Sequence, residues 1–147
     1  GWTATNETPW RRRLKRVPLE LPEELAGMLA GMVQMVATPD GRLVVSAGTQ
    51  IGIFDRRTRV LQTVPGSWDG FAAIAANDDS IFMVGPTGWY QQTLRRSSHD
   101  GTTIAEYQFG GYEFRAAALS PGGCLFCLTN TLDDEEDEII ALDAQTM

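Results

Sequence analysis

A degenerate internal repeat constrains the fold of this chain more than any other feature of its sequence. Residues 37–43, which read Ala-Thr-Pro-Asp-Gly-Arg-Leu, return at 119–125 as Leu-Ser-Pro-Gly-Gly-Cys-Leu, and a weaker copy, Ala-Asn-Asp-Asp-Ser-Ile, occupies 76–81. The last residues of the three copies lie 38 and 44 positions apart. A second segment, Ile-Phe-Asp-Arg-Arg-Thr at 53–58, returns at 141–146 as Ala-Leu-Asp-Ala-Gln-Thr. A recurrence of roughly 40–45 residues predicts a chain built from a few similar structural units.

Each unit consists of short apolar segments separated by turn residues. From Met32 onward the segments are rich in Val, Ile, Phe and Thr, and no stretch keeps the period of an amphipathic helix. The Pro-Asp-Gly and Asp-Gly sequences between them are strong turn signals. We therefore expect an all-β region in three units, residues 32–69, 70–112 and 113–147. We expect strands at 33–37, 43–47, 50–54 and 59–64 in the first unit, and in the second a long hairpin from Trp89 to Phe109 that turns at 97–101.

Two patterns resemble the repeats of β-propeller proteins of the WD-repeat, YVTN and quinoprotein-like groups. They are Pro-Asp-Gly-x-Leu at 39–43, and two apolar residues followed by Asp-x-x-Thr at 53–58 and 141–146. The resemblance extends over roughly residues 32–147 in three degenerate copies. It implies a partial β-propeller of about three four-stranded antiparallel blades with an N-terminal extension. A β-sandwich is the alternative all-β fold.

The resemblance also implies a role for the turn between the third and fourth strands of a unit. Asp55 with Thr58, and Asp143 with Thr146, would use their short polar side chains to bond backbone N–H groups inside this turn. The Trp of the WD dipeptide is replaced here by Phe and by Leu, and the Gly-His dipeptide of that family is absent. The wider hydrogen-bond network of WD repeats is therefore not carried over to this chain.

Three units are too few for a closed propeller, because closed rings contain roughly 4–8 blades. We expect the chain to be a piece of a longer propeller, or to complete its ring by other means. Residues 1–31 form an N-terminal extension in which Trp10–Leu21 would be the outer strand of a neighbouring blade, or a strand available to close the last one. A short helix is expected over 22–29, because a proline followed by two glutamates opens this stretch.

The net charge of −7 belongs almost entirely to one segment. The six consecutive acids at 133–138, together with Asp143, account for the whole excess, and the rest of the chain balances its acids with its bases. No apolar run approaches the roughly 20 residues that cross a bilayer, and no signal peptide opens the chain. We therefore expect a cytoplasmic or nuclear protein without membrane contact, although a fragment could have lost a leader. The basic run at 11–16 has no matching basic surface elsewhere, so nucleic-acid binding is not expected.

None of the motifs that carry chemistry is complete in this sequence. Cys124 and Cys127 lie three residues apart on an expected strand, so we expect packing cysteines on opposite faces, without a second ligand pair for zinc. The acidic segment lacks the glycine and glutamate that a calcium-binding EF-hand loop needs. His99, the single histidine, lies in a hairpin turn, and no Gly-x-Ser-x-Gly elbow is present. We therefore expect no catalytic residue, no cofactor and no metal site.

Propeller geometry would gather the aromatic and acidic loops on one face of the molecule. Exposed aromatic residues beside charges favour protein interaction. The leading hypothesis is a non-enzymatic interaction scaffold whose partners are other proteins or further blades of the same propeller. One alternative is that Trp68 and Trp89 pack between blades; another is a fragment of an enzymatic propeller of the lactonase or quinoprotein type, with a site shared with other blades. The residues expected to bind partners are Trp68, Asp69, Trp89, Tyr90, Asp133, Asp134, Glu135 and Glu136.

Overall fold

The computed structural model describes residues 33–147, apart from 48, 67–70, 89–90 and 132–135. The described part is all-β and contains no helix: eleven strands form three separate antiparallel sheets. The all-β prediction is therefore confirmed. The N-terminal extension, with its expected outer strand and short helix, lies outside the described residues. Within the described residues there is no apolar helix of membrane-spanning length.

Sheet 1 is a four-stranded meander in which each strand pairs with the next one along the chain. The end of its first strand and the start of its second follow directly from turn residues, because the Pro-Asp-Gly sequence at 39–41 separates these two strands. The fourth strand begins one residue later than expected, because Arg59 adopts a φ of 59° and cannot continue a strand. The strands are β1 (Val33–Ala37), β2 (Leu43–Ala47), β3 (Gln50–Asp55) and β4 (Val60–Val64).

Sheets 2 and 3 repeat the same meander. Sheet 2 contains the long hairpin expected in the second unit, which turns at His99–Gly101 between its third and fourth strands. Sheet 3 has three described strands, and a turn over 144–146 follows its last one. The strands of sheet 2 are β5 (Ala73–Ala76), β6 (Ser80–Gly88), β7 (Gln91–Ser98) and β8 (Thr103–Gly110); those of sheet 3 are β9 (Tyr112–Leu119), β10 (Cys124–Thr131) and β11 (Asp137–Asp143).

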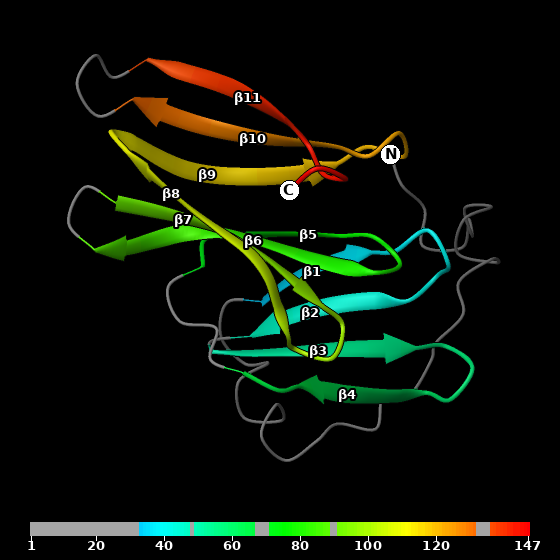
Figure 1. The fold of residues 1–147 in the computed structure, drawn as a ribbon. Coiled ribbons are helices and arrows are strands. Elements are labelled where there is room, and N and C mark those ends of the chain that lie inside the picture. Colours follow the sequence, from blue (N-terminus) through cyan, green and yellow to red (C-terminus); the bar gives the residue numbers. More distant parts are fainter. Residues whose placement is uncertain (1–32, 48, 67–70, 89–90, 132–135) are drawn as a thin grey trace, which may run out of the picture.

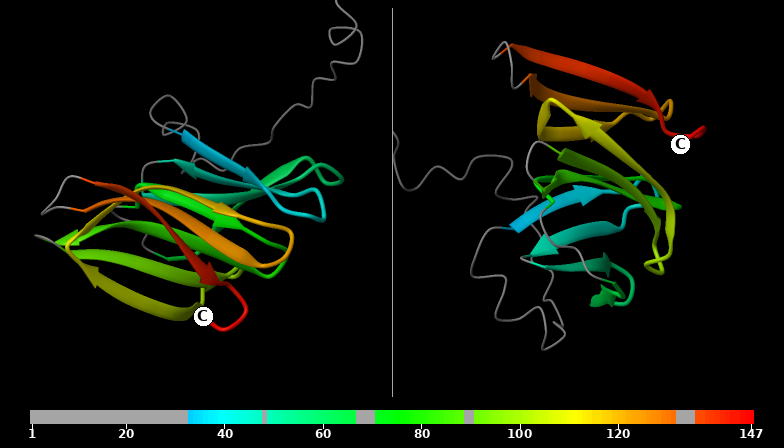
Figure 2. Two further views of the ribbon diagram at one scale, coloured as in Figure 1. Left: turned by 90° about the horizontal axis from the view of Figure 1, so that it is seen from above. Right: turned by 60° about the vertical axis from the view of Figure 1, so that its left-hand side comes forward.

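The three sheets stack face to face, with sheet 2 in the middle (Figures 1 and 2). One apolar cluster, which includes Val44 and Ile81, fills the space between sheets 1 and 2. A second cluster, which includes Phe82 and Leu125, joins sheets 2 and 3. A third, which includes Val45 and Leu61, lies on the other face of sheet 1. Since alternate residues of a strand point to opposite faces, the middle sheet is apolar on both sides.

The meander places two kinds of connection at opposite ends of the stack. The turns β1–β2, β5–β6 and β9–β10 lie at one end, on the right of Figure 1. The opposite side of the stack holds the last residues of β6 and β10 and the first residues of β7 and β11. We call these the turn end and the loop end of the molecule.

Candidate functional site

The turn end of the molecule contains an open pocket of about 490 Å³. This volume lies within the range of small-ligand sites in proteins, roughly 300–1,000 Å³. Its walls come from all three sheets, because the first turn of each sheet reaches it. Its walls carry polar and charged groups together with two proline rings. The residues are Thr38 and Pro39 from sheet 1, Asn77, Asp79 and Arg96 from sheet 2, and Ser120 and Pro121 from sheet 3.

A short polar side chain shapes each of the three turns around the pocket. Thr38 Oγ1 accepts a hydrogen bond of 3.0 Å from the N–H of Arg42. Asn77 Oδ1 accepts from the N–H groups of Asp79 and Ser80, at 3.0 and 2.7 Å. Ser120 Oγ accepts from the N–H of the residue four positions later, at 3.0 Å. Such side chains satisfy turn amides that would otherwise have no partner, which holds the rim of the pocket in one shape.

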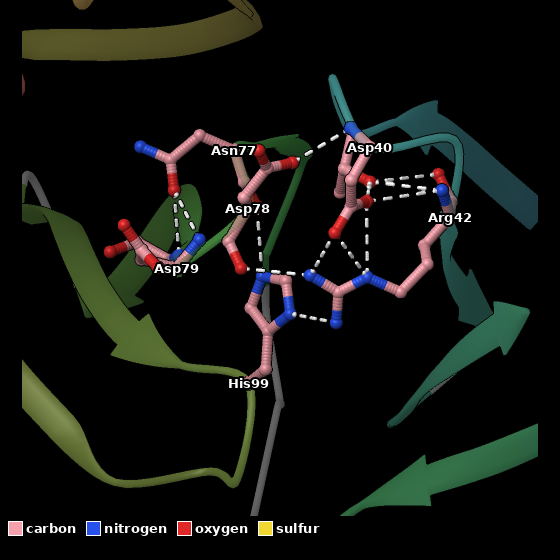
Figure 3. Close-up of polar contacts among 8 residues, drawn as sticks. Asp40, Arg42, Asn77, Asp78, Asp79 and His99 are labelled. Carbon is pink, nitrogen blue, oxygen red and sulfur yellow. Dashed lines mark hydrogen bonds and ion pairs between the residues drawn. The ribbon is translucent and has the colours of Figure 1, made fainter.

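The single histidine joins sheet 1 to sheet 2 beside this pocket (Figure 3). Arg42 Nη1 lies 3.0 Å from His99 Nδ1, and His99 Nε2 lies 2.9 Å from the carbonyl oxygen of Asn77. Because a guanidinium can only donate and a carbonyl can only accept, Nδ1 accepts and Nε2 donates. Both nitrogen atoms of the ring therefore serve structural hydrogen bonds.

Arg42 is the centre of this contact between the sheets. It forms an ion pair of 2.7 Å with Asp40 and donates from Nη2 to the carbonyl oxygen of Asp78 at 2.8 Å. The side-chain hydrogen bond from Arg42 is the main reason that the pKa of the Asp40 carboxyl lies well below its usual range. The same hydrogen bond raises the pKa of Arg42. Both groups stay charged over a wide pH range, so the contact between sheets 1 and 2 does not depend on their titration.

We expect His99→Ala to lower the free energy of unfolding by about 1–2 kcal/mol, because it removes one hydrogen bond between sheets 1 and 2 and one within sheet 2. The two bonds can be separated. His99→Asn offers an acceptor near the position of Nδ1, and His99→Gln offers a donor near Nε2, so each should recover part of the loss. Urea unfolding followed by tryptophan fluorescence measures the three variants. Equal stability of the wild type and His99→Ala would show that this contact does not hold the sheets together.

Arg96 joins sheet 2 to the segment that follows β11. Its Nε donates to Ser80 Oγ at 2.9 Å, and its Nη1 donates to the carbonyl oxygen of Met147 at 2.8 Å. Its guanidinium also lies over the ring of Phe82, 5.7 Å from the ring centre. The positive charge at the pocket wall is therefore held in place by three separate contacts.

The predicted turn residues adopt one geometry at two places in the repeat. Asp55 Oδ1 accepts from the N–H two residues later at 2.8 Å, and Asp143 Oδ1 does the same at 2.9 Å. Thr58 and Thr146 donate their hydroxyl protons back to the carbonyl oxygens of these aspartates, at 3.4 and 3.3 Å.

In the β7–β8 turn, a hydrogen bond from Ser98 is the main reason that the pKa of Asp100 falls to about 2.

Most of the predicted partner-binding residues fall outside the part of the chain that the structure describes. Only Glu136 lies among the described residues. It is exposed at the loop end, where its N–H donates to Thr131 Oγ1 at 3.2 Å. The others, Trp68, Asp69, Trp89, Tyr90, Asp133, Asp134 and Glu135, lie outside the described residues.

The two cysteines lie on β10, one half-buried and one fully buried. Cys127 is part of the apolar cluster between sheets 2 and 3, whereas Cys124 is partly exposed to solvent. Burial raises the pKa of the Cys127 thiol to about 11. In the described part of the chain, no group of three or more His, Cys, Asp or Glu side chains is placed to hold a metal ion.

We expect iodoacetamide to alkylate Cys124 but not Cys127 in the folded protein at mildly alkaline pH. The thiolate is the reactive form, and Cys127 is both inaccessible and protonated under these conditions. Mass spectrometry after a short exposure distinguishes the two sites, and in urea both should react. Rapid labelling of Cys127 under native conditions would contradict the packing of β10 against sheet 2.

Comparison with known proteins shows a fold and no family. No protein-family model matches this chain, and no curated protein matches it. Among solved structures, the tail fiber of Staphylococcus aureus phage P68 is similar, with a TM-score of 0.56 and 12% sequence identity. The alignment covers 82% of this chain and 29% of the tail fiber chain, so this chain spans less than a third of that protein. At this identity the likeness concerns the fold alone.

Proposed function

We propose that the chain is a non-enzymatic interaction scaffold whose sheets are consecutive blades of a β-propeller. Its loop end would bind a protein partner with a basic surface. The proposal of a propeller is supported by the three meanders that stack in chain order and by the same turn chemistry at corresponding positions. The pocket at the turn end would remain free for a second ligand.

The position of the acidic segment is the observation that carries the interaction function. Thr131, two residues before the segment, is the last residue of β10, and Asp137, within the segment, is the first residue of β11. The last residue of β10 and the first residue of β11 both lie at the loop end. The end of β6 and the start of β7, on either side of residues 89–90, lie there too. Glu136, Asp137 and Glu138 are exposed there. Complementary charge of this kind steers a basic partner toward one end of the molecule.

A library of displayed random peptides tests the proposal, with the whole chain as bait. We expect the enriched peptides to be rich in lysine, arginine and aromatic residues, and to bind more weakly as salt concentration rises. The variant Glu136→Gln/Glu138→Gln should weaken their binding severalfold, because it removes two exposed charges from the loop end.

The variant Asp78→Asn/Asp79→Asn is the matched control. It removes two exposed charges from the turn end by equally isosteric changes, so binding at the loop end should be unaffected. Peptides that bind equally well to both variants, or a library without basic enrichment, would contradict the proposed site. Binding lost only in the control variant would place the interaction at the turn end instead.

A further inference from the structure

The outer face of sheet 3, which points away from sheet 2, is apolar and exposed. Ile139 is 70% exposed, Phe126 41% and Leu128 39%. The strand register places these side chains in two adjacent rows across the sheet. The first row is Ala118, Phe126 and Ala141, and the second is Ala116, Leu128 and Ile139. All three alanines are exposed as well.

In sheets 1 and 2, the central residues of the corresponding rows are buried between sheets. The repeat aligns Phe126 with Val44 of β2 and with Phe82 of β6, because each follows the last residue of a repeat copy. Val44 lies in the cluster between sheets 1 and 2, and Phe82 lies in the cluster between sheets 2 and 3. The register completes their rows as Val36, Val44 and Ile53 in sheet 1, and Ala75, Phe82 and Arg96 in sheet 2.

Each such row packs against the facing side of the next sheet along the chain. In the next sheet, the partners are alternate residues of the second strand: Ile81 and Met83 in sheet 2, and Leu125 and Cys127 in sheet 3. All four are fully buried. The pattern is continuous through the molecule, since each sheet offers one face to the sheet before it and one to the sheet after it. The outer face of sheet 3 has no described partner, and its large apolar side chains are exposed.

A second copy of this chain does not offer the required partner face. On the corresponding face of sheet 1, Val45 and Leu61 are buried, whereas Met35, which pairs with Val45, is 62% exposed. The centre of this face is therefore already covered. A head-to-tail dimer would need it to be free. Apolar rows of this size on a protein surface mark interaction sites.

We propose that the outer face of sheet 3 is a docking surface for a further antiparallel sheet of the same repeat. That sheet would carry apolar side chains at the two positions of its second strand that correspond to Ile81 and Met83. The surface is continuous with the two interfaces already present between the sheets, which is why a sheet of the same kind fits it. This inference rests on the propeller architecture of the proposed function, and it adds the surface and the kind of partner.

The repeat supplies a direct test. Thr146 corresponds to Thr58, so Met147 corresponds to Arg59, and a copy of residues 60–112 can be appended after Met147. The appended copy would provide a fourth strand for sheet 3 and then a sheet with the required face. The probe is a thiol at Ile139, introduced as Ile139→Cys in a chain that also carries Cys124→Ser.

We expect the extension to slow the alkylation of the thiol at position 139 by about tenfold or more, because the appended sheet covers it. The matched control is Ile104→Cys on β8, where the isoleucine is 49% exposed and its thiol should react equally fast in both chains. Changing Ile81→Lys and Met83→Lys only in the appended copy should restore fast alkylation at position 139. That restoration would show that the predicted face makes the contact.

Three outcomes would overturn the inference. The first is an unchanged rate of alkylation at position 139 in the extended chain. This result would count whether the appended sheet folds elsewhere or stays unfolded, because a true docking surface should make the appended sheet fold against it. Protection that survives the two lysines would show a different mode of contact. Protection in the unextended chain that grows with protein concentration, together with a dimer in sedimentation, would assign the face to a second copy. Peptide binding at the loop end is measured independently, so a failure here is distinguishable from a failure of the interaction function.

Discussion

Replacing Gly101 with alanine is expected to lower the free energy of unfolding by about 3 kcal/mol, one of the two largest effects of a single substitution that we predict. Gly101 lies in the β7–β8 turn of sheet 2 with a φ of +94°, in the left-handed region that disfavours a side chain. A Cβ atom there would also overlap the carbonyl oxygen of Pro65, which follows β4 of sheet 1. The turn would have to move away from sheet 1, close to the contact between Arg42 and His99.

The variant Gly41→Ala separates the two causes. Gly41 has a similar φ of +88°, but a Cβ atom at this position would have nothing within 4 Å. Its cost should therefore be the conformational penalty alone, about 1–2 kcal/mol. Urea unfolding followed by circular dichroism measures both variants. Equal costs for the two substitutions would mean that the approach of the β7–β8 turn to Pro65 does not exist in solution.

Phe82→Ala is expected to cost about 3–5 kcal/mol, because it empties the centre of the cluster between sheets 2 and 3. The ring is 0% exposed and lies with Leu125 and Cys127 of sheet 3. The guanidinium of Arg96 also loses the ring over which it lies. A residual cavity should form, because two stacked sheets cannot close the gap without losing contacts elsewhere.

Phe126→Ala is the matched control, since Phe126 occupies the corresponding position of the next repeat. Its side chain is 41% exposed, so the same chemical change should cost less than about 1 kcal/mol in this chain. Urea unfolding again measures both. Similar costs at the two positions would contradict the stacking of sheet 3 on sheet 2, or would show that the outer face of sheet 3 is already covered.

The strands could be predicted because their signals are local. β1 and β2 begin and end at the expected residues, since Pro39, Asp40 and Gly41 specify a turn whatever surrounds them. The start of β4 could not be predicted, because nothing in the residue type announces that Arg59 will adopt a positive φ. The polar residues that open the three turns at the pocket were available in the repeat alignment, where Thr38, Asn77 and Ser120 fall at one position. Their shared hydrogen-bonding role is visible only in the structure.

The sequence by itself determined the β class, the order of the strands and the period of the repeat, because alternation and turn chemistry act between near neighbours. It also showed that the net negative charge comes almost entirely from one segment. Only the tertiary structure decided which faces are buried and which side chains meet. Arg42 and His99 are 57 residues apart, and their contact exists because sheets 1 and 2 stack in one particular register. The same stacking buries Phe82 and leaves Phe126 exposed, although the repeat gives both residues the same place on their strands.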